Sequence, residues 1–149
     1  MPVLRGLGFS GSYPHFRRVQ ESHVDLLMFS FGKYGGAVAC EISYVDFAKT
    51  NLIDPKLAQN RPLVVTQTCE RFRLGSMPEY GKLDHWFIYD PTSPKRQTTP
   101  IEIAERLKEL VRTQGMQWWS EKKIKANQST HRNADMASAA SAKSGARRG

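Results

Sequence analysis

The sequence predicts an α+β fold, in which a single antiparallel sheet of about five strands packs against a C-terminal amphipathic helix. Two observations indicate this fold. Residues 1–90 contain short segments in which apolar and polar residues alternate, separated by turns with glycine and proline, as expected of antiparallel strands. Residues 100–114 then carry apolar side chains at three- and four-residue spacing, which is typical of a helix that covers a sheet.

Five segments have the pattern of strands. Residues 24–31 are apolar on both faces, which favours a central strand covered on both sides. The glycines of residues 32–36 suit a hairpin turn, and residues 37–45 then alternate with Cys40 on the apolar face. Residues 46–62 have no clean period and are predicted to form a long connection. The predicted strands are residues 13–20, 24–31, 37–45, 64–74 and 85–89.

The start of the helix has a clear local signal. Thr99 is suited to the N-cap, Pro100 to the first helical position, and Glu102 to the third, which together form a capping box. Gly115 is expected to end this helix. We therefore predict one α+β domain over residues 1–124 and a disordered basic Ala/Ser/Lys/Arg tail over residues 125–149.

The charge of the chain is concentrated near its C-terminus. The net charge is +8, and residues 120–149 account for +5 of it, which leaves +3 for residues 1–119. The domain itself is therefore weakly basic, and weak nucleic-acid binding through the tail is a second alternative function. The sequence contains no apolar run long enough to span a bilayer and no signal-peptide pattern at Met1–Arg5, so a cytoplasmic location is expected.

Catalytic and cofactor motifs give little support to an enzyme. The two cysteines, Cys40 and Cys69, lie in strand-like segments without metal-ligand spacing, so we expect both to be reduced and no metal site. Residues 6–11 match a dinucleotide fingerprint, but the strand and helix that it requires are missing, so no cofactor is predicted. The enzyme alternative needs Cys69 as a nucleophile beside a histidine such as His15 or His85. Packing of Cys69 in a buried strand is the favoured interpretation.

Residues 68–75 carry the best candidate for a ligand site. In a strand, Cys69, Arg71 and Arg73 would share one face, with Phe72 and Leu74 on the other. Two arginines on one face can hold a carboxylate or phosphate with forked donors. The alternative is a structural brace, in which they pair with Glu41 or stack on an aromatic ring. Tryptophan is enriched in recognition surfaces, so Trp86 is included among the candidate ligand-binding residues. The predicted ligand-binding residues are Arg71, Arg73, Glu41 and Trp86, with no catalytic residue.

Four short motifs occur in order along the chain: residues 7–9 (LGF) leading to 16–18 (FRR), 69–75 (CERFRLG), 84–87 (DHWF) and 115–118 (GMQW). Together they resemble a family of small, mostly bacterial domains, the domain-of-unknown-function family 4304, over roughly residues 4–120. It implies an α+β fold and no established activity or cofactor. Family members usually begin with a helix before the Leu-Gly-Phe element, so we expect that helix to be truncated or missing here.

These observations favour a non-catalytic binding module for a protein partner or a small anionic ligand. By association with bacterial conflict systems, an immunity-like role is one form of this hypothesis. Adjacent Trp118 and Trp119 cannot both face inward in regular structure, so we expect one of them to be exposed, and contact with a partner is one alternative role for it. An exposed sheet edge is a further route to a homodimer.

Overall fold

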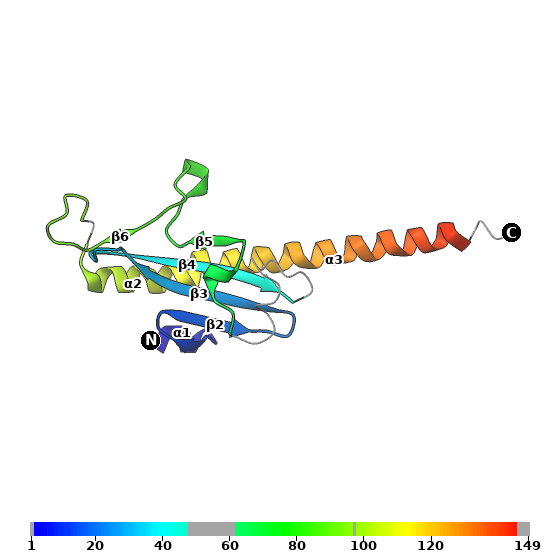
Figure 1. Cartoon of the computed structure of the whole chain (residues 1–149), viewed down its shortest axis with the longest axis horizontal. Helices are drawn as coiled ribbons and strands as arrows, with labels where there is room; N and C mark the ends of the chain where they lie inside the picture. The colour runs from blue at the N-terminus through cyan, green and yellow to red at the C-terminus, as the bar shows by residue number, and fades with distance from the viewer. Residues whose placement is uncertain (1, 48–61, 97, 146–149) are drawn as a thin grey trace. The chain divides into compact units, whose positions relative to one another are not determined.

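One antiparallel sheet forms the frame of this protein (Figure 1). The computed structural model describes residues 2–47, 62–96 and 98–145. The chain divides into two units, Met1–Trp119 and Ser120–Gly149, and the sheet belongs to the first. Most of the long connection predicted over residues 46–62 lies outside the described residues.

The predicted single antiparallel sheet is confirmed. Its strands follow the order β1-β2-β3-β4-β5, and β6 also pairs with β4. The predicted strands over residues 64–74 and 85–89 are much shorter in the structure, and β1 is additional. The strands are β1 (Ser10–Ser12), β2 (His15–Val19), β3 (His23–Phe31), β4 (Ala37–Asp46), β5 (Arg71–Arg73) and β6 (Phe87–Ile88).

The central position of β3 explains its apolar sequence. It pairs with β2 on one side and β4 on the other, and residues 23–29 are all buried. Successive side chains point to opposite faces, so both faces of β3 need cover. We call the face that carries Leu27, Phe29 and Ile42 the helix face. The second face carries Val24, Leu26, Met28 and Val45, which pack with Val65 and Leu63.

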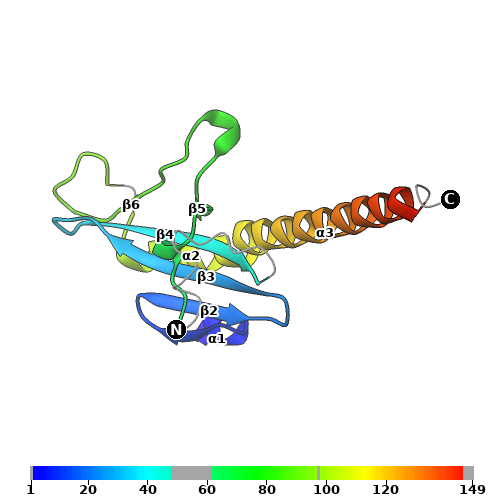
Figure 2. The same cartoon turned by 45° about the vertical axis from the view of Figure 1, so that its right-hand side comes forward.

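Helical residues after β6 cover the helix face. Helix α2 (Pro100–Leu110) begins with the predicted capping box, in which Thr99 accepts from the Glu102 amide, and it buries Ile103, Leu107 and Leu110. Figures 1 and 2 show α2 behind the sheet from both directions. The helix therefore packs on the sheet as the apolar spacing predicted.

The prediction that Gly115 ends the helix is wrong. A π-helical turn (Val111–Gly115) joins α2 directly to α3 (Met116–Gly145). Gly115 is buried, and a Cβ placed there would lie 3.3 Å from the Trp119 ring. The glycine thus makes room for the tryptophan instead of terminating the helix.

Helices lie at both ends of the described chain. A five-residue helix, α1 (Pro2–Gly6), precedes the Leu-Gly-Phe element and buries Leu4, so of the two expected cases, a truncated or a missing helix, the helix is not missing. At the other end, α3 continues to Gly145, where a disordered tail was predicted from residue 125. Alanine, lysine and arginine favour helix, which accounts for this difference. No helix among the described residues is long and apolar enough to cross a membrane.

Candidate functional site

The predicted arginine site is built on the second face of the sheet by the pairing of β4 with β5. In this register Glu41 lies opposite Arg73. Arg73 Nε and Nη2 donate to the same oxygen, Glu41 Oε1, at 3.1 and 2.8 Å. Arg71 Nη1 lies 3.7 Å from the other oxygen, Oε2. Glu41 is only 7% exposed, so a nearly buried carboxylate holds both arginines.

The remaining contacts of Arg73 are made by the segment that follows η3 (Pro78–Tyr80). Its Nη1 forms an ion pair with the Asp84 carboxylate, and its guanidinium lies 4.7 Å from the centre of the Trp86 ring. All four predicted ligand-binding residues therefore come together. Their arrangement corresponds to the brace, because the charges of Arg71 and Arg73 are balanced by those of Glu41 and Asp84.

Sequence reasoning missed Asp84, although it lies in the DHWF motif two residues before Trp86. The ion pair between Arg73 and Asp84 forms only because residues 74–86 leave the sheet and return to it, and the sequence does not show this path. Ser76 Oγ donates to the Leu83 carbonyl, and backbone bonds join Met77 to Lys82. A Cβ at Gly75 would lie 2.6 Å from the His85 ring, so only glycine allows this close return.

The structure overturns the predicted position of Cys69. The chain forms a 3-10 turn, Val65–Gln67, and β5 begins only at Arg71, so Cys69 lies outside the strand and is exposed. The hydroxyl of buried Thr68 donates to the Val65 carbonyl, which satisfies this turn locally. Packing of Cys69 in the core is therefore wrong. Within the described parts of the chain, no histidine hydrogen-bonds to its thiol.

The tryptophan pair near the end of the first unit is divided between core and surface. Trp119 is buried, and its Nε1 donates to the Ser43 carbonyl at 2.8 Å. Trp118 is half-buried and stacks on Phe72, with ring centres 6.1 Å apart. As predicted, the two rings do not both face inward: Trp119 lies in the core, and Trp118 remains partly exposed.

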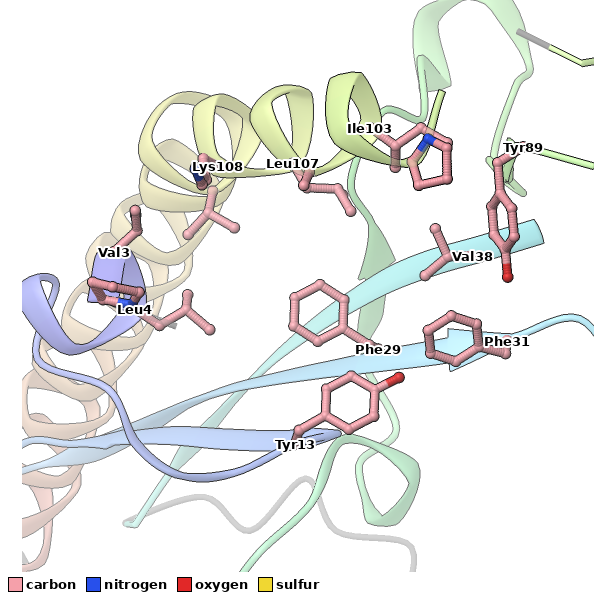
Figure 3. A pocket seen from close by; sticks show the side chains of 14 residues that line it. Val3, Leu4, Tyr13, Phe29, Phe31, Val38, Tyr89, Ile103, Leu107 and Lys108 are labelled. Carbon is pink, nitrogen blue, oxygen red and sulfur yellow. The ribbon is translucent and has the colours of Figure 1, made fainter. Parts of the chain in front are cut away.

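A second candidate site lies on the helix face, and sequence reasoning missed it. A cavity of about 450 Å³ lies between the sheet and α2. Figure 3 shows Ile103 and Leu107 of α2 pointing toward Phe29 and Val38 of the sheet. These four side chains are each less than 10% exposed, yet space remains between them. The volume falls within the roughly 300–1,000 Å³ of small-molecule pockets.

Aromatic side chains form the rim of this pocket. Tyr13 is 54% exposed and Phe31 is 50% exposed, which marks the side open to solvent. Tyr13 stacks on Phe29 with ring centres 6.0 Å apart and an interplanar angle of 20°. Tyr89 stands beside Phe31 and Val38 in Figure 3. The site is thus an apolar chamber with two phenol groups at its entrance.

The pocket could not be found from one motif, because its walls come from separate segments. Leu4 belongs to α1, Tyr13 to the turn before β2, Phe29 to β3 and Val38 to β4. The signal available in the sequence was the apolar stripe of α2, which was assigned wholly to packing. A groove opens where two packed elements diverge, and sequence spacing does not encode that divergence.

A third group of charged residues is also buried on the helix face. Arg18 Nε and Nη2 both donate to Asp25 Oδ2, at 2.8 and 2.7 Å. Asp25 is 1% exposed. The guanidinium lies 4.9 Å from the centre of the Phe9 ring and 5.4 Å from that of Trp119. This arrangement is closed to solvent and has the character of a structural pair.

The described residues offer no group that is suited to a metal ion. Among residues 2–47, 62–96 and 98–145, no group of three histidine, cysteine or acidic side chains is placed to hold a metal ion. Burial raises the pKa of the Cys40 thiol, and the nearby Glu41 carboxylate raises it further, so this cysteine stays protonated. Burial also lowers the pKa of His85, with a smaller contribution from Arg106.

Comparison with known proteins agrees with the resemblance predicted from the four motifs. Residues 1–121 match the family described as "Domain of unknown function (DUF4304)". The chain belongs to this family. Searches of curated proteins and of solved structures give no significant match. The DUF4304 domain covers the whole sheet, α2 and the start of α3, so both candidate sites lie within the region that defines the family.

Proposed function

We propose that this DUF4304 protein is a non-catalytic binding module that holds a small, mainly apolar molecule between its sheet and α2. The observation that carries the proposal is the cavity of about 450 Å³ behind the rim of Tyr13 and Phe31. A protein interior is normally close-packed, so a gap of this size between well-buried side chains needs a reason. A ligand that occupies this cavity would explain why the side chains leave it open.

The site around Arg71 and Arg73 gives less support to the small anionic ligand that the sequence predicted. Arg73 already binds Glu41 and Asp84, so an incoming anion would have to displace a carboxylate from it. Arg71 is the more available cation, with 45% of its side chain exposed. Exposed ion pairs contribute little free energy, about 0–1 kcal/mol, so one such arginine is a weak anchor.

Binding of a protein partner is the second candidate function. The loop over residues 74–86 exposes Met77 (38%), Tyr80 (72%) and Leu83 (67%). Both views show this loop standing away from the sheet (Figures 1 and 2). Its base is held by the Arg73–Asp84 ion pair and by the Gln114 side chain, which accepts from the Gly75 amide and donates to the Ser76 carbonyl. A preorganised loop with apolar side chains is suited to recognition, as an immunity-like role requires.

The other hypotheses gain little support. A cytoplasmic location and nucleic-acid binding through the basic C-terminal residues stay predictions. Homodimer formation through a sheet edge also stays a prediction, although β1 and β5 have only three residues each and offer few backbone groups. The enzyme alternative would need a base near exposed Cys69.

The pocket can be tested by filling it. Ala104 lines the cavity, yet it is exposed on α2, so Ala104→Trp would place a large ring in the entrance without disturbing the core. Ile101→Trp is the matched control, since Ile101 is 76% exposed on the same helix and does not line the cavity. We expect the wild type and Ile101→Trp to bind 2-ethylnaphthalene in an NMR titration, and Ala104→Trp to lose at least about tenfold in affinity. Equal affinity of all three proteins, or no binding by the wild type, would contradict the proposal.

A further inference from the structure

Two tyrosine hydroxyls face the open side of the apolar pocket. Tyr13 is held by stacking on Phe29, and its ring also lies 6.0 Å from that of Phe31. Tyr89 is held by its backbone amide, which donates to the Gly36 carbonyl at 2.8 Å. Figure 3 shows both hydroxyls directed toward the Phe31 side of the chamber. The fold therefore holds the Tyr13 ring and the backbone of Tyr89 beside the pocket.

The hydroxyls are available as donors. Within the described parts of the chain, neither the Tyr13 nor the Tyr89 hydroxyl hydrogen-bonds to another residue. Burial raises the pKa of Tyr13, and the neighbouring Tyr89 raises it further, so the phenol keeps its proton at neutral pH. The walls of the chamber are otherwise almost entirely apolar, so these two groups are placed to orient a ligand.

We propose that the ligand of this pocket is a mainly apolar molecule with one neutral carbonyl group, and that Tyr13 and Tyr89 donate hydrogen bonds to its oxygen. This inference rests on the function proposed above and specifies the chemistry of the same site. A carbonyl oxygen has two lone pairs, so it accepts from two hydroxyls at once. An apolar body fills the chamber, and the carbonyl fixes its orientation at the entrance.

A neutral oxygen fits the site better than an anion. Lys108 is the charged residue among the described residues that line the pocket, and its Nζ forms an ion pair with Glu105 at 2.5 Å. A carboxylate in the chamber would lose its hydration and compete with Glu105 for that ammonium. Burial of an unpaired charge is far more costly than burial of a hydrogen-bonded neutral group.

The test uses three probes of one shape: 2-acetylnaphthalene, 2-ethylnaphthalene and 2-naphthoate. Tyr13→Phe and Tyr89→Phe each remove a single oxygen atom and keep the ring. We expect each variant to bind the ketone about three- to tenfold more weakly than the wild type, the usual range for one neutral hydrogen bond. Affinity for the hydrocarbon should stay within about twofold, because that probe has no oxygen to lose a bond. The carbonyl stretch of the bound ketone should also move to higher wavenumber in the double variant.

The outcomes separate this inference from the proposed function. If 2-ethylnaphthalene binds and Ala104→Trp blocks it, the pocket is a binding site. The carbonyl inference then fails if both tyrosine variants bind the ketone as the wild type does, with an unchanged carbonyl stretch. It also fails if 2-naphthoate binds most tightly of the three, which would identify an anionic ligand. If no probe binds the wild type, the proposed function itself is overturned.

Discussion

The two faces of the sheet each bury an arginine–carboxylate pair, and the two pairs are built alike. On the helix face, Arg18 directs Nε and Nη2 to one oxygen of Asp25. On the second face, Arg73 directs the same two nitrogens to one oxygen of Glu41. Each guanidinium also lies over an aromatic ring, that of Phe9 for Arg18 and that of Trp86 for Arg73.

The pairs differ in how far they are closed to solvent. Arg18 and Asp25 have side-chain exposures of 14% and 2%, and the partners of Arg18 include the Leu7 carbonyl and Met116 Sδ. Around Arg73 and Glu41, the Arg71 side chain is 45% exposed and that of Asp84 is 76% exposed. Apart from Arg18, the Asp25 carboxylate has the His23 ring at 3.7 Å, which carries a charge only when protonated. Glu41 instead has a second permanent cation, Arg71. This difference predicts unequal costs for breaking them.

The largest effect is expected from Arg18→Met, which leaves the Asp25 carboxylate buried without its guanidinium. Methionine keeps much of the packing against Phe9, so the loss is mainly electrostatic. Removing one partner of a buried ion pair costs about 3–5 kcal/mol, which we expect in the free energy of unfolding from urea titration. Arg17→Met is the control, since Arg17 points to the opposite face of β2 and its loss should cost less than about 0.5 kcal/mol. Similar costs for the two variants would show that the closed pair does not stabilise the fold.

An intermediate effect is expected from Arg73→Met. Glu41 keeps Arg71 at 3.7 Å, so its charge is not left alone, but it loses two donated hydrogen bonds. Hydrogen bonds to charged groups are worth about 1.5–3 kcal/mol, and we expect a loss of about 2 kcal/mol in the same titration. Arg71→Met, at the exposed end of the cluster, should cost less than about 1 kcal/mol. The brace interpretation would be wrong if Arg71→Met proved the more destabilising of the two.

The same comparison shows what the sequence could reveal. The second-face pair was predictable, because the alternation of residues 68–75 placed two arginines on one face and residues 37–45 placed Glu41 in the neighbouring strand. The helix-face pair was missed, since Asp25 stands in an apolar run. A hairpin centred between Glu21 and Ser22 would have paired Arg18 with Asp25, as the observed register does. The turn contains no glycine, so the sequence does not indicate where this hairpin is centred.

Local signals succeeded where one segment determines the outcome, and failed where several segments meet. The capping box at Thr99 depends on four consecutive residues and is confirmed. Cys69 was misplaced because a 3-10 turn replaced the first half of the predicted strand. The pocket depends on the distance between α2 and the sheet, which involves Phe29, Val38 and Leu107 together. Such distances follow from packing of the whole unit and have no sequence period.

The smallest effect on stability is expected at a third carboxylate, which is hydrogen-bonded but not buried. Glu102 at the start of α2 is exposed to solvent, and it accepts bonds from the Thr98 hydroxyl and from the amide and hydroxyl of Thr99. The Thr98 hydroxyl first, and then Thr99, lower the pKa of Glu102 to about 2. A lowered pKa in the folded state means that the ionised carboxylate stabilises the fold above its unfolded pKa of about 4.3, and that this contribution fades as pH falls toward 2.

Glu102→Gln should therefore be less stable than the wild type at pH 6, and the difference should shrink between pH 4.5 and 2 because glutamine does not titrate in this range. Urea titrations at five or six pH values would measure it. A difference that stays constant over this range would mean that the carboxylate charge contributes nothing at the helix start.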